Sequence, residues 1–320
     1  MKAMRLADSG DSSALVEEDI PRPLPGRGEV LIKVYAVGVT SKELLWYPTT
    51  HDKNGERRRR AVPGHEFSGV VAAVGDDVDH FVVGQEIYGM NDWFADGATA
   101  EFCITQPANI ASKPVTLTHI EAASVPISAL TAWQGLFERA KLRPGEHVLV
   151  HGGAGGVGLF AIQLARFAGA QVTTTASSRN SEFVRQLGAE RAIDYRAMPF
   201  EKQVTEVDVV FDTVGGETLR RSWSVLKPGG RMVTVAADSE ATIDERTKQG
   251  FFIVEANGEQ LSRVGRMLDA GDLRTEVDAV LPLHRAAEAY AGTVKERRGR
   301  GKLVISVDAQ ESRRKERGES

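Results

Sequence analysis

The sequence predicts an α/β protein with two parts, one rich in short β-strands and one built on a doubly wound parallel sheet. Strand-like segments separated by turns fill the first hundred residues, and strands alternate with helices between residues 148 and 254. A glycine-rich turn joins the first strand of the alternating part to its helix. Sheets that bind dinucleotides use this connection.

The composition indicates a soluble globular protein. The chain has 320 residues, of which 42 % are hydrophobic, and this is enough to fill two cores. A net charge of −4 gives no sign of a nucleic-acid or membrane partner, and no apolar run has the length of a membrane span. The N-terminus lacks the apolar segment of a secretory signal, and a single cysteine, Cys103, excludes an internal disulfide. We therefore expect a cytoplasmic protein.

The β-rich part is predicted from runs of β-branched and apolar residues. These runs lie at residues 30–37, 67–74, 82–88 and 100–105. A polar stretch with four arginines, at residues 51–60, separates the first two runs and is typical of a solvent loop. Short strands at this spacing predict a compact barrel or sandwich.

The alternating part follows a helical stretch at residues 120–137. Its predicted strands lie at residues 148–150, 171–176, 191–195, 207–212, 231–236 and 251–254. Its predicted helices lie at residues 157–167, 181–187 and 216–226. This alternation predicts a parallel sheet with its ligand at the carboxyl ends of the strands.

The end of the chain is similar in pattern to its beginning. Beyond Asn257 a helix, a strand and a second helix lead to a final β run at residues 301–307. We expect this segment to complete the β-rich part. The charged tail at residues 308–320 is predicted to be disordered.

The glycine cluster at residues 152–158 predicts the cofactor. Glycine lets the backbone approach a pyrophosphate, and the following helix offers free N–H groups at its positive end. The next strand ends Thr-Thr-Thr-Ala-Ser-Ser-Arg-Asn at residues 173–180, without the carboxylate that binds the ribose of NAD. Hydroxyl groups and Arg179 suit a 2′-phosphate and favour NADP, although Arg179 as an ordinary surface residue is the alternative.

Ordered motifs along nearly the whole chain resemble the zinc-free quinone oxidoreductase branch of the medium-chain dehydrogenase/reductase superfamily. The motifs are GVT at 38–40, PGHEFSGVV at 63–71, GQEIYG at 84–89, TAWQ at 131–134, HGGAGGVG at 151–158, LGA at 187–189, DY at 194–195, DTVGGE at 212–217 and GKLV at 301–304. The resemblance implies a GroES-like catalytic domain from residues 1–117 and 257–307. It also implies a Rossmann domain from residues 118–256, with NADPH bound in the cleft between the two domains.

The resemblance also implies which residues contact the cofactor. Those expected along the pyrophosphate are Ala154, Gly155, Gly156 and Val157. Those expected around the 2′-phosphate are Ser177, Ser178, Arg179 and Tyr195. Those expected near the nicotinamide are Thr131, Val235 and Val254. Asn180 stands where the family usually has a lysine, so Arg179 or Arg297 is expected to take its place.

His65-Glu66 is similar to the ligand motif of zinc alcohol dehydrogenases. A catalytic zinc needs three protein ligands and one open position. The zinc relatives have a cysteine where this chain has Thr40, and a histidine where Ser41 stands. The remaining thiol, Cys103, lies in a predicted strand. The sequence therefore predicts a site without a metal.

A site without a Lewis acid favours substrates that are already activated by conjugation. We therefore predict hydride transfer from NADPH to a quinone or to the β-carbon of an α,β-unsaturated carbonyl. Hydrogen bonds from Thr131, Tyr47 or the ribose would meet the developing charge, with the proton taken from solvent. The candidate pocket residues are Thr40, Trp46, Tyr47 and Trp93, whose aromatic rings suit flat substrates and could equally pack at the domain junction. Thr40 replaces the asparagine usual in the family.

Two other functions are compatible with the sequence. A 2-enoyl thioester reductase would need a deep pocket and a tyrosine acid, and a regulatory protein would bind NADPH without turnover. The resemblance and an exposed sheet edge also predict a homodimer that pairs at residues 251–254.

Overall fold

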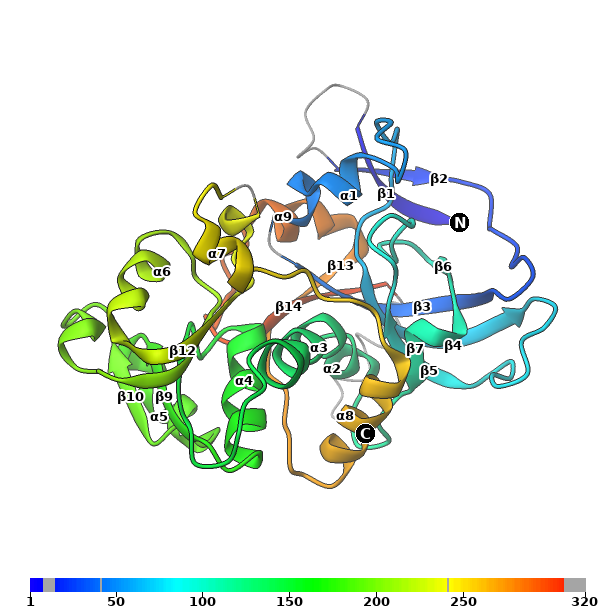
Figure 1. Cartoon of the computed structure of the whole chain (residues 1–320). Coiled ribbons are helices and arrows are strands. Elements are labelled where there is room, and N and C mark those ends of the chain that lie inside the picture. Colours follow the sequence, from blue (N-terminus) through cyan, green and yellow to red (C-terminus); the bar gives the residue numbers. More distant parts are fainter. Residues whose placement is uncertain (8–14, 41, 241, 308–320) are drawn as a thin grey trace.

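The computed structural model describes residues 1–7, 15–40, 42–240 and 242–307. Ser41 and the tail at residues 308–320 therefore lie outside the described residues. Figure 1 shows the two parts of the molecule beside each other, with α3 (Pro126–Trp133) between them. None of the helices in the described part of the chain is both long and apolar enough to cross a membrane.

One part contains a five-stranded parallel sheet with the strand order β10-β9-β8-β11-β12. Its strands are β8 (His147–His151), β9 (Gln171–Ala176), β10 (Arg191–Asp194), β11 (Val207–Asp212) and β12 (Leu226–Thr234). The strand order reverses between β8 and β11. Ligands of such sheets bind at the carboxyl ends of the strands on either side of this reversal.

Helices pack around the parallel sheet. They are α4 (Gly156–Phe167), α5 (Ser181–Gln186), α6 (Gly216–Ser222) and α7 (Glu245–Gly250). Helix α4 lies between the sheet, where it contacts β8 and β9, and α3. Because both of its sides are covered, α4 is apolar through most of its length, with Leu159, Phe160 and Ile162 buried.

The other part contains a seven-stranded sheet with the order β13-β14-β3-β4-β5-β7, in which β6 also pairs with β3. Its strands are β3 (Val30–Gly38), β4 (Glu66–Val74), β5 (Glu86–Met90), β6 (Phe102–Thr105), β7 (Ile110–Ser112), β13 (Val277–Pro282) and β14 (Lys302–Ser306). Strand β14, red in Figure 1, pairs with the blue strand β3, so a late segment of the chain completes the sheet that the early strands form. The domain boundaries near residues 117 and 257 stay predictions.

The remaining elements cover the ends of these sheets. They are the antiparallel pair β1 (Lys2–Leu6) and β2 (Leu15–Asp19), and the helices α1 (Tyr47–Thr50), α2 (His119–Ala122), α8 (Gly258–Asp269) and α9 (Ala286–Ala291). The pair β1–β2 had no counterpart among the predicted strands.

Three predicted elements differ most from the observed ones, beyond shifts in the ends of others such as β12 and α6. The helix expected at residues 120–137 divides into α2, α3 and a π-helical stretch, Gln134–Arg139, because Pro126 cannot donate a backbone hydrogen bond and starts a new helix. The strand expected at residues 82–88 begins only at Glu86, after a turn in which Gly84 has a φ of 91°. The strand expected at residues 251–254 is reduced to one bridge between Phe251 and Thr234.

Candidate active site

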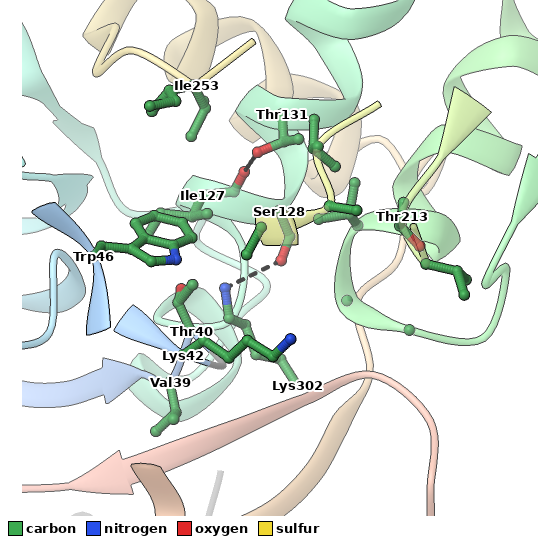
Figure 2. Close-up of a pocket in the computed structure, with 18 of the residues that line it drawn as sticks. Val39, Thr40, Lys42, Trp46, Ile127, Ser128, Thr131, Thr213, Ile253 and Lys302 are labelled. Atoms are coloured by element: carbon green, nitrogen blue, oxygen red, sulfur yellow. Dashed lines mark hydrogen bonds between the residues drawn. The ribbon is translucent and has the colours of Figure 1, made fainter. Parts of the chain in front are cut away.

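A cavity of about 470 Å³ lies between the parallel sheet and the β-rich part. Figure 2 shows side chains from both parts of the molecule reaching into it. The β-rich part contributes Val39, Thr40, Lys42, Trp46, Lys302 and Leu303, helix α3 contributes Ile127, Ser128 and Thr131, and the parallel sheet and its loops contribute Gly155, Gly156, Val157, Thr213, Val235 and Val254. The cavity thus lies at the carboxyl ends of the parallel strands, where the sequence predicted the ligand.

The glycine turn between β8 and α4 forms one wall of the cavity. Gly155 caps α4 without a side-chain hydrogen bond, and the first turn of the helix carries no acidic residue. A Cβ at Gly158 would overlap the carbonyl oxygen of Gly152, and a Cβ at Gly156 would lie 3.0 Å from Ser128 Oγ. The glycines therefore let the turn pack closely against its neighbours, and the N-terminus of α4 keeps N–H groups without a side-chain cap, which fits a pyrophosphate.

The residues expected around the 2′-phosphate lie beyond the carboxyl ends of two neighbouring strands, Ser177, Ser178 and Arg179 after β9 and Tyr195 after β10, outside the cavity lining. Ser177 is buried, whereas Ser178, Arg179 and Tyr195 are exposed. Asn180 Nδ2 donates a hydrogen bond of 2.9 Å to the carbonyl oxygen of Gly299. The Arg179 guanidinium lies against Gly299, so this strand end contacts the loop that precedes β14.

Arg297 belongs to the same loop and lines the cavity. Its Nε donates a hydrogen bond of 2.6 Å to the buried carboxylate of Asp278, which also accepts the backbone N–H of Gly299. Both candidates for the missing lysine, Arg179 and Arg297, therefore lie on or beside one loop of the β-rich part.

Three residues expected near the nicotinamide, Thr131, Val235 and Val254, all line the cavity. The Thr131 hydroxyl donates a hydrogen bond of 2.6 Å to the carbonyl oxygen of Ile127. The hydroxyl hydrogen is therefore engaged within α3, and its oxygen is left to accept hydrogen bonds.

The sequence reasoning missed a buried ion pair at the cavity. Lys302, whose side chain is 9 % exposed, pairs with the fully buried carboxylate of Glu66, and its Nζ donates to Ser128 Oγ at 3.3 Å. Glu66 also accepts the backbone N–H of Ile127 at 3.0 Å. Burial lowers the pKa of the Lys302 ammonium, and the carboxylate of Glu43 opposes this shift. Lys302 is the lysine of the GKLV motif, which indicates the family in the sequence but does not predict a buried ion pair.

The aromatic wall contains Trp46 and Trp93. Their rings meet edge to face with 4.8 Å between centroids, and Trp93 Nε1 donates a hydrogen bond of 2.9 Å to the carbonyl oxygen of Val254. Trp93 lines a neighbouring, wider cavity of about 860 Å³ rather than the one that Trp46 and Thr40 line. Trp93 therefore packs against Trp46 without lining the cavity between the two parts.

The structure does not bring Tyr47 into the cavity. Its side chain is 49 % exposed and stacks on His51, with 4.5 Å between ring centroids. Trp46 is extended and precedes α1, while Tyr47 is the first residue of this helix. The side chains of these two neighbours point in different directions because the backbone changes conformation between them, so the prediction of Tyr47 as a pocket residue is corrected.

The residues at His65 do not fit a catalytic zinc. The His65 ring is fully buried, with Nδ1 2.5 Å from Glu43 Oε1 and Nε2 3.1 Å from the carbonyl oxygen of Ala95. Cys103 is buried in β6, where burial raises the pKa of its thiol. Within the described ranges, no three His, Cys, Asp or Glu side chains gather in a way that could hold a metal ion.

The fold and the cavity define a two-domain oxidoreductase of the dinucleotide-dependent class. Residues 26–118 match the family described as alcohol dehydrogenase GroES-like domain, and residues 187–305 match the family described as zinc-binding dehydrogenase. The chain is 33 % identical over 317 residues to a probable zinc-binding oxidoreductase, mitochondrial, of Arthroderma benhamiae, covering 92 % of this chain and 94 % of that protein. The chain belongs to the medium-chain dehydrogenase/reductase superfamily.

Solved structures agree with this assignment. The quinone oxidoreductase from Coxiella burnetii is 33 % identical and superimposes with a TM-score of 0.86, over 96 % of this chain and 99 % of that one. A mycobacterial protein complexed with NADPH is 28 % identical and superimposes with a TM-score of 0.81, over 96 % of this chain and all (100 %) of the other. The Rossmann and GroES-like fold expected from the sequence is thus confirmed.

Proposed function

We propose that this protein transfers a hydride from NADPH to a quinone or to the β-carbon of an α,β-unsaturated carbonyl, without zinc. One observation carries the proposal. A single cavity connects the glycine turn at the N-terminus of α4 to an apolar and aromatic wall, and its described lining contains neither histidine nor cysteine. Such a lining fits a flat, conjugated substrate beside a nicotinamide. The names of the quinone oxidoreductase from Coxiella and of the NADPH complex support the same substrate and cofactor.

The chain's own residues would hold the cofactor along the cavity. The N–H groups at Gly156 and Val157 would bind the pyrophosphate, with the Lys302 ammonium beside them as a counter-charge. Ser177, Ser178, Arg179 and Tyr195 would surround the 2′-phosphate, and Thr131, Val235 and Val254 would position the nicotinamide. When it is bound, NADPH supplies the hydride with its two electrons.

The substrate side would work by exclusion of water and by hydrogen bonding. Trp46, Ile127 and Ile253 provide apolar walls, in which a negative charge on the substrate oxygen interacts strongly with a nearby donor. Solvent supplies the proton that completes the reduction. No tyrosine lines the described part of the cavity, which speaks against the tyrosine acid that a 2-enoyl thioester reductase would need.

An electron-acceptor panel tests the proposal. NADPH and NADH would be compared side by side with quinones, enones and an enoyl thioester, after dialysis and measurement of bound zinc. We expect turnover of a quinone or an enone with NADPH preferred. Tight NADPH binding without turnover of any acceptor would instead identify a regulatory protein, and stoichiometric zinc would exclude the metal-free site.

We also propose a homodimer and a cytoplasmic location. Strand β12 is the outer strand of the parallel sheet, and residues 251–254 continue beside it, with Ile253 partly exposed. An unpaired edge of this kind is suited to pairing with a second copy. Sedimentation should give twice the mass of 34.7 kDa. Fractionation of cells should find the protein outside mitochondria, whereas the name of the Arthroderma relative places that protein in mitochondria.

A further inference from the structure

The indole N–H of Trp46 has no hydrogen-bond partner, although its Nε1 atom is buried. Buried indole N–H groups are normally hydrogen-bonded, because a donor that loses its hydrogen bond to water and gains no other destabilises the folded protein. Trp46 lines the cavity between the two parts, and Figure 2 shows its nitrogen on the edge of the ring nearer to Thr40. An unpaired donor at a ligand cavity indicates an acceptor that arrives with the ligand.

Several other donors around the cavity are already engaged, whereas Lys42 places an exposed ammonium among the lining residues. Thr131 donates its hydroxyl hydrogen to Ile127, and Lys302 is held by Glu66 and Ser128. Trp93, the neighbour of Trp46, donates its indole N–H to Val254. The two tryptophans in contact thus differ, since the indole N–H of Trp93 is bonded within the protein and that of Trp46 is left for a ligand.

The ring of Trp46 is held firmly enough to aim its N–H. It meets Trp93 edge to face, and Trp93 is fixed to the backbone of Val254, which itself lines the cavity at the expected nicotinamide position. His65 packs against the same Trp93 ring, with 5.0 Å between centroids. A donor fixed in advance stabilises a transition state without further reorganisation.

We propose that the indole N–H of Trp46 donates a hydrogen bond to the carbonyl oxygen of the conjugated substrate and stabilises the charge that this oxygen gains. The inference rests on the proposed function. The hydride pair forms a C–H bond at the β-carbon, the electrons of the C=C bond move toward the carbonyl, and the oxygen becomes an enolate oxygen. Water then protonates the α-carbon, and the indole keeps its own hydrogen. For a quinone the same hydrogen bond meets the phenolate oxygen before water protonates it.

This role predicts which acceptors are reduced. Trp46 offers a partly buried donor beside the apolar side chains of Ile127 and Ile253, so a flat acceptor with an oxygen conjugated to the reducible carbon gains most from it. A conjugated acceptor of the same shape that lacks such an oxygen loses this stabilisation.

Nuclear magnetic resonance of the indole groups tests the contact in the unaltered protein. The chain has four tryptophans, so ¹⁵N-tryptophan labelling gives four indole signals, which single Trp→Phe variants assign. NADP⁺ is added first, and 2-cyclohexenone second, so that no turnover occurs. We expect the Trp46 signal to move downfield when the enone is added. A signal that moves fully with NADP⁺ alone, or that ignores the enone, would overturn the proposal.

The variant Trp46→Phe tests the catalytic consequence. It keeps an aromatic ring and removes the N–H, so kcat for an enone should fall about 100-fold, while the KM for NADPH stays unchanged. The matched control is Trp223→Phe, because Trp223 lies after α6 beneath Arg246 and away from the cavity. A kcat for Trp46→Phe within threefold of the unaltered protein would overturn the proposal.

The two hypotheses fail in different ways. If the unaltered protein reduces no quinone or enone, the proposed function fails. If it does reduce them and Trp46→Phe does so equally well, only the role of Trp46 fails. Should Trp46→Phe not fold, the indole signals of the unaltered protein decide.

Discussion

The two halves of the cavity are built in different ways. The nucleotide half is formed mainly by backbone, with the glycine turn after β8 and the free N–H groups of α4. The substrate half is formed by side chains from segments far apart in the chain, such as Trp46, Ile127 and Ile253. A backbone site depends on a short, local pattern of residues, whereas a side-chain site depends on how distant segments pack. The first can be found in a sequence, and the second requires the structure.

The largest expected effect concerns Lys302, which joins the two halves through Glu66 and Ser128. In Lys302→Met the buried carboxylate of Glu66 loses its partner, so the free energy of unfolding should fall by about 3–5 kcal/mol. Urea denaturation measures this change. The double variant Lys302→Met/Glu66→Gln removes the unpaired charge and should recover much of the loss. A double variant as unstable as the single one would mean that the unpaired carboxylate of Glu66 is not the cause of the loss.

The same contrast explains what the sequence could predict. Residues 152–158 are contiguous, so strand, turn and helix were all visible in one short pattern. Lys302 and Ser128, by contrast, are 174 residues apart, and no spacing rule connects them. The orientation of Trp46 and Tyr47 was equally hidden, because a short turn before a four-residue helix has no periodicity to show which side chain points inward.

Acid should destabilise the parallel-sheet part and the β-rich part of the molecule to different extents, because each contains a buried, neutral histidine and the pKa values of the two differ. Burial lowers the pKa of His151, at the end of β8, to about 3, and that of His119, in α2, to about 4. In the unfolded chain both titrate near their usual value of about 6.5. The unfolded state therefore binds more protons below that pH, and each histidine costs about 1.4 kcal/mol per pH unit as the pH falls toward its folded pKa.

Denaturation at pH 6.5 and pH 5 measures this loss, which is about 2 kcal/mol for each histidine. His151→Gln keeps a group that can bond to Thr175 and Ser222, and it should remove more of the acid sensitivity than His119→Gln, most clearly below pH 4. Equal slopes in the variants and the unaltered protein would contradict the assignment of neutral, buried rings.

A smaller effect is expected at the 2′-phosphate end of the nucleotide half. Arg179→Ala removes a cation beside the expected phosphate, so the KM for NADPH should rise about tenfold, while the KM for NADH stays the same. Arg185→Ala, on the exposed face of α5, is the matched control for loss of a positive charge. An equal rise for both cofactors would indicate a general loss of charge rather than a contact with the 2′-phosphate.

The smallest expected effect separates two neighbours in the chain. Tyr47→Phe removes a hydroxyl that lies outside the cavity on a half-exposed ring stacked on His51, so kcat for an enone should change by less than about twofold. Trp46→Phe removes one N–H from the adjacent residue, yet the expected loss is about 100-fold. Steady-state kinetics with one enone compares the two variants directly. If Tyr47→Phe were the more damaging change, the Tyr47 hydroxyl would be the donor to the substrate oxygen. Trp46 would then contribute only packing to the cavity wall.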